Sequence, residues 1–241
     1  MFEKILSRLW KKNITPAKKE SDAAPRDLSP QQPENTSFAP RWMDATDPGN
    51  PFGIAGCDCF AYTQSLRSTT SQQNVESYFN LRGDFGKRLI GLLPDNCMEI
   101  PCSLEYPYAG EIADGALFKS QAMEEKWDIY LYQSRIYFCR SWTGVLAYVG
   151  EIEFNDGKVR IHKIYAPREI AEDDTEYAIR QVDYLNKNHL FKSVEPHPLP
   201  KNFPLDLDKI AAFSFSQYGS KCCFATYEDT INFKCPPRKP V

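Results

Sequence analysis

Three histidines and eight cysteines set the limits on the nucleophilic or metal chemistry that this 241-residue chain could perform. Nucleophilic catalysis needs a base within hydrogen-bonding reach of a Ser or Cys. His189 continues a helical apolar stripe, His162 lies in an alternating strand pattern, and His197 lies between two prolines. None of these three side chains has a known nucleophile motif beside it. The sequence therefore assigns no catalytic residue.

The cysteine spacings do not predict a metal site. Structural zinc usually takes Cys-x2-Cys or His-x3-His pairs, because both ligands must reach one tetrahedral ion. The cysteine pairs here are Cys57-x-Cys59, Cys97-x4-Cys102 and the adjacent Cys222-Cys223. We expect no metal and no other cofactor, and we interpret most of these side chains as thiols buried in strands. A site assembled from distant cysteines stays open.

Loops that bind phosphate are also missing from the sequence. Neither Gly-x-Gly-x-x-Gly nor Gly-x4-Gly-Lys-Ser/Thr occurs, and Gly83–Lys87 is too short to wrap a phosphate. Asp128, Glu151 or Glu153 could project from the meander and serve in carboxylate acid–base chemistry. Charged side chains are expected on the solvated face of a half-buried sheet in any case. Nucleotide hydrolysis is therefore disfavoured.

The turn at residues 140–144 is the strongest candidate for a binding site. Short turns usually carry Asn, Asp, Gly or Ser, whereas this one presents Trp142 beside Arg140, Ser141 and Thr143. Trp and Arg often dominate binding energy, because each combines a large contact area with directional donors. The alternative interpretation is structural: Trp142 folds back over the sheet and Arg140 pairs internally.

A second candidate binding element begins the chain. Its apolar side chains fall at helical spacing, and the basic residues lie mostly off that stripe. The stripe consists of Phe2, Ile5, Leu6, Leu9 and Trp10. It predicts a basic amphipathic docking helix over residues 1–12, for a partner groove, its own domain or a membrane surface. Such a short helix is marginal in isolation, so we favour docking on protein over docking on membrane.

The composition divides the rest of the chain into a linker, a domain and a tail. Residues 13–41 contain five prolines among Ala, Ser, Glu, Gln and Lys, with almost no aliphatic residue. Such a composition cannot recover its ordering entropy and predicts a disordered linker, hence a flexible N-terminal arm. We expect one globular domain over residues 42–235 and a basic, Pro-rich tail over 236–241.

The middle third of the sequence predicts an antiparallel sheet. Four segments are rich in aromatic and β-branched residues and are separated by turn signals. These segments are Trp127–Tyr132, Arg135–Ser141, Val145–Phe154 and Lys158–Tyr165. They predict a central four-stranded meander. Further strand candidates are Cys57–Tyr62, Arg88–Leu93, Met98–Glu105, Leu117–Met123 and Cys222–Tyr227.

Two main helices are predicted to flank this sheet. The first begins at a Thr70 or Ser71 cap and stops at Gly83. The second follows Asp173, Asp174 and Thr175, which are predicted to cap it, and runs to about Leu190. Helices and an antiparallel sheet together give an α+β fold.

Charge and hydropathy limit the partners of the chain. Residues 1–41 carry eight Lys and Arg against five Asp and Glu, whereas the remaining residues carry 21 against 27. An acidic body repels phosphate backbones, so we expect no nucleic acid and a basic protein partner. No run of 18 apolar residues occurs, and charges interrupt the N-terminal apolar stretch. We therefore expect a cytoplasmic protein with reduced thiols.

These observations favour a cytoplasmic protein-binding module that occludes a basic partner, as immunity proteins and antitoxins do. The alternative is an enzyme, a hydrolase or transferase, with a cleft near the turn at residues 140–144. A second alternative is a membrane-peripheral accessory protein docked by residues 1–12. No family motif favours one of the three.

Overall fold

The structure, a computed structural model, describes residues 38–68, 71–108, 110 and 112–233. The predicted docking helix with Phe2, Ile5, Leu6, Leu9 and Trp10 lies outside the described residues. So do nearly all of the predicted linker and the predicted tail over residues 236–241. The described residues, from Phe38 onward, belong to one compact unit.

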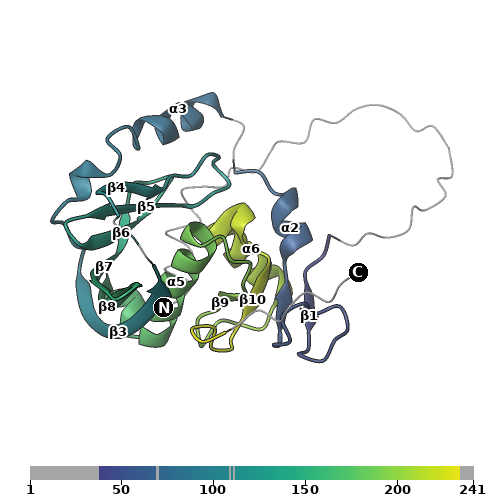
Figure 1. Cartoon of the computed structure of the whole chain (residues 1–241). Coiled ribbons are helices and arrows are strands. Elements are labelled where there is room, and N and C mark those ends of the chain that lie inside the picture. The colour runs from purple at the N-terminus through teal and green to yellow at the C-terminus, as the bar shows by residue number, and fades with distance from the viewer. Residues whose placement is uncertain (1–37, 69–70, 109, 111, 234–241) are drawn as a thin grey trace. The chain divides into compact units, whose positions relative to one another are not determined.

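The unit has the predicted α+β class, with two sheets and helices between and beside their strands (Figure 1). The first half of the chain contains β1 (Arg41–Met43), β2 (Gly56–Asp58), α2 (Phe60–Ser65), α3 (Gln72–Asn80), the 3-10 turn η1 (Lys87–Leu89), β3 (Cys97–Pro107) and β4 (Gly115–Phe118). The second half contains β5 (Trp127–Tyr132), β6 (Arg135–Arg140), β7 (Leu146–Asn155), β8 (Lys158–Pro167), α4 (Arg168–Ala171), α5 (Thr175–Leu185), the π-helical turn η2 (Asn186–Leu190), β9 (His197–Pro198), α6 (Leu207–Tyr218), the 3-10 turn η3 (Gly219–Lys221) and β10 (Phe224–Thr226).

The larger sheet is antiparallel and has the strand order β3-β8-β7-β6-β5-β4. The predicted meander corresponds to β5 through β8 and is the centre of this sheet, but the sheet is larger than the meander, because β3 and β4 add an edge strand on each side. The Met98–Glu105 prediction is therefore confirmed. The strand predicted at Leu117–Met123 is wrong after Phe118, because β4 covers Gly115–Phe118 and the chain then turns toward β5.

Tight turns hold the meander in register. Gln133 and Ser134 connect β5 to β6 with φ values of 52° and 58°, the pattern of a type I′ turn. Asp156 and Gly157 connect β7 to β8, also with positive φ. Asn-Asp-Gly is a strong sequence signal for such a turn, whereas Gln-Ser is a weak one. Both hairpins nevertheless form.

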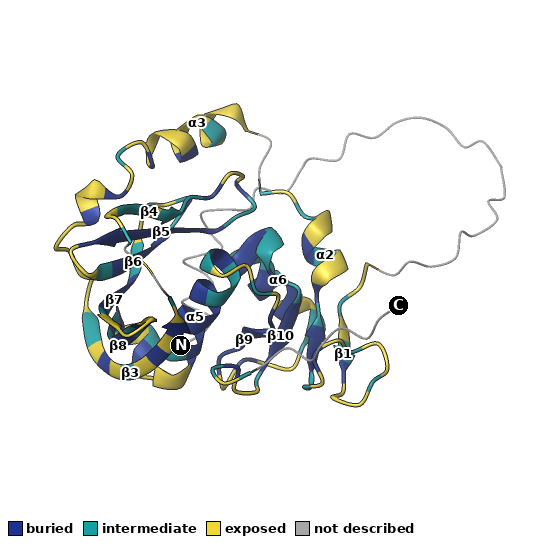
Figure 2. Cartoon of the chain, in the orientation of Figure 1, coloured by how far each residue is buried: buried dark blue, intermediate teal, exposed yellow. Residues whose placement is uncertain are grey.

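The central strands are buried on both faces, as Figure 2 shows. On one face, Ile129 and Phe138 pack with the Val182 stripe of α5 in the main core. On the other face, Tyr130 and Tyr137 pack with Leu89. Because side chains alternate along a strand, each strand serves two separate cores.

The second predicted helix is α5, which starts where predicted but ends earlier than predicted. The Asp174 carboxylate accepts a hydrogen bond from the backbone N–H of Tyr177 at 2.9 Å, as an N-cap does. α5 ends at Leu185, and the remaining turn to Leu190 is π-helical. The first predicted helix is α3, which begins after Ser71.

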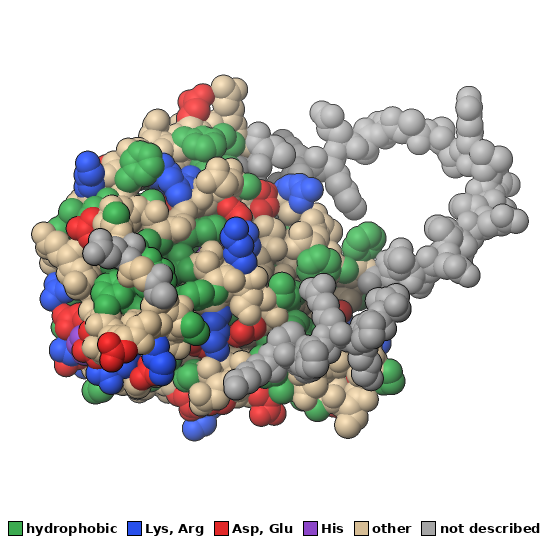
Figure 3. Space-filling model, in the orientation of Figure 1, with side chains coloured by type: hydrophobic (Ala, Val, Ile, Leu, Met, Phe, Trp, Pro, Cys, Tyr) green, Lys and Arg blue, Asp and Glu red, His purple; other side chains and the backbone are tan. Residues whose placement is uncertain are grey.

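The segment that follows α3 covers the second face of the sheet, so the strand predicted at Arg88–Leu93 is wrong. Gly86 and Gly91 have φ values of +78° and +80° and turn the chain at both ends of η1. A Cβ on Gly86 would lie 2.5 Å from the ring of Tyr130. The segment therefore crosses close over the strands instead of pairing with them. Its apolar side chains contribute to the green area over and beside α3 in Figure 3.

The smaller sheet has the order β1-β2-β10-β9, with β9 parallel to β10. The strand predicted at Cys57–Tyr62 is wrong in its second half, because β2 ends at Asp58 and α2 begins at Phe60. The strand predicted at Cys222–Tyr227 is confirmed at its centre as β10.

Candidate functional site

The Arg140 side chain of the predicted site points into the protein. Its guanidinium donates to the carbonyl oxygens of Ser216 and Gln217 at 2.5 and 2.9 Å. These carbonyls belong to the last turn of α6, where a cation is favourable. The guanidinium also lies 4.7 Å from the centre of the Trp127 ring. Arg140 therefore joins α6 to the sheet.

The neighbouring residues of the turn have mixed positions. The Ser141 hydroxyl is buried and donates to the carbonyl of Glu125 at 2.8 Å. The indole N–H of Trp142 donates to the carbonyl of Met123 at 2.7 Å. Thr143 is exposed. Of the four predicted binding residues, Thr143 is thus the one whose side chain faces solvent, and the contacts of the other three agree with the structural interpretation.

A buried lysine that sequence reasoning missed lies under this turn. Lys126 Nζ is 2.6 Å from the hydroxyl of Ser68 and 3.0 Å from the carbonyl of Met123. The same ammonium lies 5.0 and 4.6 Å from the ring centres of Trp142 and Phe215. Burial, together with the smaller effect of the Arg140 charge, lowers the pKa of Lys126 to about 7.

A lysine of near-neutral pKa beside a hydroxyl can activate a serine nucleophile. The Ser68 hydroxyl donates to the carbonyl of Met123 at 2.9 Å, so its proton points away from Lys126 in this arrangement. Ser68 and Lys126 are 58 positions apart, and only the fold brings them together. No spacing rule could have found this pair.

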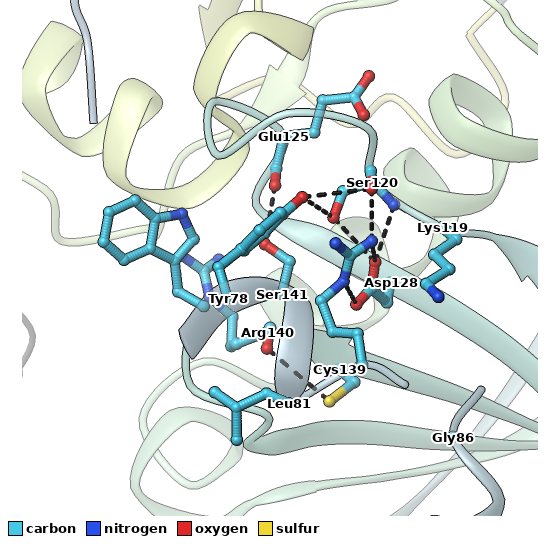
Figure 4. Close-up of polar contacts among 12 residues, drawn as sticks. Tyr78, Leu81, Gly86, Lys119, Ser120, Glu125, Asp128, Cys139, Arg140 and Ser141 are labelled. Atoms are coloured by element: carbon cyan, nitrogen blue, oxygen red, sulfur yellow. Dashed lines mark hydrogen bonds and ion pairs between the residues drawn. The ribbon is translucent and has the colours of Figure 1, made fainter. Parts of the chain in front are cut away.

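A buried ion pair fixes the segment after α3 to the sheet, and Figure 4 shows its hydrogen bonds. Arg82 Nε and Nη2 lie 2.6 and 2.9 Å from the two carboxylate oxygens of Asp128. Asp128 also accepts from the backbone N–H and the hydroxyl of Ser120 at 2.8 and 2.9 Å. The expectation that Asp128 lies on a solvated face of the sheet is wrong, because Arg82 comes from another element and covers it.

Tyr78 of α3 completes this anchor. Its hydroxyl lies 2.8 Å from the hydroxyl of Ser120 and donates to the carbonyl of Ala122 at 3.0 Å. The Arg82 guanidinium lies 4.3 Å from the centre of the Tyr78 ring. Although α3 is otherwise mostly exposed, its last turn is therefore held firmly.

Above this anchor, the chain presents apolar side chains to solvent. We call this set the 79–93 surface; its members are Phe79, Leu81, Phe85, Ile90, Leu92 and Leu93. Phe79 is 57% exposed, and Phe85 and Leu92 are each 51% exposed. The backbone below is fixed, because the Tyr132 hydroxyl donates to the Phe85 carbonyl at 2.9 Å and the Gly91 amide donates to the Tyr137 hydroxyl at 3.1 Å.

The predicted turn at residues 140–144 borders the 79–93 surface. A Cβ on Gly144 would lie 2.8 Å from a guanidinium nitrogen of Arg88. Val145, the next residue, is 56% exposed. The exposed end of the turn and the 79–93 surface therefore form one candidate interaction surface.

Basic side chains surround the 79–93 surface. Lys119 Nζ lies 3.9 Å from the centre of the Phe85 ring. Arg88 pairs with Asp84 at 2.7 Å, and Lys87 is exposed beside it. Lys87 and Lys119 are thus basic groups at this surface that form no ion pair with a carboxylate of the described residues, whereas Arg88 is paired.

The described residues hold no cluster of three or more His, Cys, Asp or Glu side chains arranged for a metal ion. Within the same ranges, every helix is too short or too polar to cross a bilayer. Comparison with protein-family models, curated proteins and solved structures found no match.

Proposed function

We propose that this chain is a protein-binding module that contacts its partner through the 79–93 surface and the exposed end of the turn at residues 140–144. One observation carries this proposal: six apolar side chains are exposed on a segment whose backbone is hydrogen-bonded to the sheet. Exposed apolar patches mark interaction sites on soluble proteins. A fixed backbone also reduces the ordering entropy that binding costs.

The charges around the surface favour a particular partner chemistry. The exposed Lys87 and the Lys119 ammonium over the Phe85 ring favour acidic groups at the matching points of an otherwise apolar partner face. The net charge of the whole chain predicted a basic partner instead. Local charge determines which faces dock, so for this surface we propose acidic groups on the partner. An occluding role, of the kind that immunity proteins have, fits such a surface.

We also propose that the protein works in a reducing compartment such as the cytoplasm. The support is that the described cysteines are reduced thiols, since thiols persist where glutathione and thioredoxin keep them reduced.

Affinity capture with the full chain as bait tests the binding proposal. We expect a stoichiometric partner in a native lysate of the source cells, retained by the wild-type chain and lost by the Phe79→Ser, Phe85→Ser double variant. Leu205→Ser is the matched control, because Leu205 is 69% exposed and lies elsewhere in the chain. Equal retention by the double variant, or no partner at all, contradicts the proposal.

A hydrolase that uses Ser68 as nucleophile is the second candidate. The observation that favours it is the 2.6 Å contact of Ser68 with Lys126, whose pKa is lowered to about 7. We expect a fluorophosphonate probe to label the wild-type chain at pH 8, and not Ser68→Ala or Lys126→Met. Ser65→Ala, at an exposed serine of α2, should keep the labelling. An unlabelled wild-type chain eliminates this candidate.

A further inference from the structure

Two cysteines lie one residue apart in the smaller sheet, away from the 79–93 surface in sequence. Cys57 is in β2, and Cys59 precedes α2; both are fully buried. The Cys59 sulfur lies 3.3 Å from the carbonyl oxygen of Cys57 and 3.5 Å from the hydroxyl of Ser214. The two thiols are close enough for each to change the ionisation of the other.

The strand register places a histidine in the same layer. Ala225 of β10 pairs with Cys57 on one side and with His197 on the other. Residues at one register position point to the same face of a sheet. The neighbouring strands therefore direct Cys57 and His197 toward a common core.

His197 has an unused nitrogen in this core. Its residue is fully buried, and Nδ1 lies 3.3 Å from the carbonyl oxygen of Pro198. Nε2 is buried and has no hydrogen-bond partner. The rings of Tyr218 and Tyr184 pack around the imidazole, with their centres 4.5 and 5.8 Å from the centre of the His197 ring. A buried polar atom without a partner is costly, and such atoms are often functional.

The cluster makes the two thiols unequal. A hydrogen bond from Cys57 has the largest effect on Cys59 and lowers the pKa of that thiol; burial opposes this, and His197 and Ser214 add to it. The same contact, together with burial, raises the pKa of Cys57. The resting Cys59 thiol can donate to its neighbours, and after ionisation its sulfur accepts from Cys57. We assign Cys59 as the nucleophile of the pair, because it directly precedes the first turn of α2 and its sulfur lies 3.5 Å from the Ser214 hydroxyl, whereas Cys57 lies within β2. The thiolate is the reactive form of a cysteine.

We propose that Cys57 and Cys59 form a redox modification site in which a hydroperoxide oxidises Cys59 and Cys57 then closes an intramolecular disulfide. In the first step the Cys59 sulfur attacks the nearer peroxide oxygen and the O–O bond breaks. The leaving oxygen takes the proton that Cys59 released, so a sulfenic acid and water, or an alcohol, result.

In the second step the Cys57 sulfur attacks the Cys59 sulfur and the S–O bond breaks. The hydroxide leaves with the Cys57 proton as water. Overall, the two thiols lose two electrons and two protons, and one hydroperoxide is reduced. A small dithiol such as dithiothreitol reverses the change by thiol–disulfide exchange.

Burial selects the oxidant. Because neither sulfur is exposed, a reagent reaches Cys59 only during local opening of the structure, and a molecule as small as hydrogen peroxide needs the smallest opening. His197 acts as a positioning residue, because it lies in the same buried layer and acts on the ionisation of Cys59, not on the peroxide. Other cysteines differ in chemistry: burial raises the pKa of Cys102 to about 11 and that of Cys139 to about 12.

Peptide mapping of the full chain tests the site directly. Trypsin releases residues 42–67 as one peptide whose only cysteines are Cys57 and Cys59, and residues 136–140 as a peptide with Cys139 alone. After brief treatment with hydrogen peroxide and alkylation of remaining thiols, we expect the 42–67 peptide to resist alkylation and to be two hydrogens lighter than its dithiol form. The 136–140 peptide should stay fully alkylated, and dithiothreitol should restore both alkylation sites of the 42–67 peptide.

Variants separate the roles of the two thiols. Cys57→Ser should accumulate a sulfenic acid at Cys59 that dimedone traps, whereas Cys59→Ser should give neither a disulfide nor a dimedone adduct. His197→Gln should slow disulfide formation several-fold while the melting temperature of the reduced chain stays above the assay temperature. The proposal is wrong if the wild-type 42–67 peptide remains a dithiol, or if Cys139 oxidises as fast as Cys59. Neither result bears on the 79–93 surface, so this proposal and the binding proposal fail independently.

Discussion

Arg82 and Asp128 form a two-point ion pair inside the protein, with their side chains 2% and 1% exposed. The pair connects the end of α3 to the first strand of the meander, across 46 positions of sequence. Asp128 has further donors in Ser120, so the carboxylate is fully bonded. The 79–93 surface depends on this contact, because the segment that carries the surface begins at it.

Removal of one partner of this pair should destabilise the protein strongly. Arg82→Met leaves the Asp128 carboxylate buried without its cation, which costs about 3–5 kcal/mol in the free energy of unfolding. Urea unfolding measures the change. The matched control is Glu105→Gln, because the Lys158–Glu105 pair is exposed and should contribute no more than about 1 kcal/mol. Similar losses in the two variants would contradict a structural role for the buried pair.

Sequence patterns predicted what depends on neighbouring residues. Aromatic and β-branched content with turn signals located β5 through β8, and the capping residues at 173–175 located the start of α5, because both signals act over a few residues. The contacts of Asp128 and Lys126 depend on groups about fifty positions away, and no local pattern encodes them. The charge of Asp128 even predicted a solvated position, because the sequence could not show that the segment around Gly86 covers that face.

The predicted site shows the same limit. Trp142 and Arg140 were singled out by their types, and types alone cannot distinguish an exposed anchor from a side chain that packs inward. The turn does border the candidate surface, through Gly144 and Arg88. That contact comes from tertiary packing between two loops and has no counterpart in the sequence.

Substitution of Trp142 should reduce stability. From the sequence, Trp142→Ala is expected to weaken capture of a partner and to leave the melting temperature nearly unchanged. In the structure, Trp142 donates to the Met123 carbonyl and its ring lies beside the Lys126 ammonium. We therefore expect Trp142→Ala to lower the free energy of unfolding by about 1–3 kcal/mol.

Thr143→Ala is the comparison for this variant, because Thr143 is exposed in the same turn. Its effect on unfolding should stay within about 0.5 kcal/mol. If calorimetry shows both variants melting like the wild-type chain, Trp142 is free to act as a binding side chain and the structural interpretation fails.

The pKa of Lys126 should make stability depend on pH above neutrality. Burial lowers this pKa to about 7 in the folded chain, whereas a lysine of the unfolded chain titrates near about 10.4. Between these values the unfolded chain binds a proton that the folded chain does not, so stability from this site rises with pH. Below pH 7 the ammonium is charged in both states, and the full desolvation penalty applies.

Lys126→Met removes this dependence. We expect the wild-type chain to gain stability relative to Lys126→Met between pH 6.5 and pH 9.5, as measured by urea unfolding at each pH. Lys158→Met, at an exposed lysine, should show no such gain. Parallel pH profiles for the wild type and Lys126→Met would mean that the Trp142 and Phe215 rings hold the ammonium in its charged form at both pH values.

A methyl group at Gly86 should detach the 79–93 surface without altering any of its side chains. At the Gly86 φ of +78°, backbone strain costs an L-residue about 1–2 kcal/mol in the free energy of unfolding. The new Cβ would also overlap the Tyr130 ring, and this overlap adds about 1–3 kcal/mol to the loss. Gly53→Ala is the control, because Gly53 has a similar φ of +67° and no atom within 4 Å of its Cβ position. The loss in the free energy of unfolding of Gly53→Ala should therefore reflect the backbone strain alone.

The two glycine variants also distinguish anchoring from mere exposure. If binding needs the segment held against the sheet, Gly86→Ala should lose the captured partner and should be cut faster by protease within residues 79–93, since local opening exposes the backbone. Gly53→Ala should keep both the partner and the protease resistance. Gly86→Ala could instead capture the partner at the wild-type level while being cleaved clearly faster. The partner would then recognise the apolar side chains without a fixed backbone. In that case the entropic part of the binding proposal would be wrong.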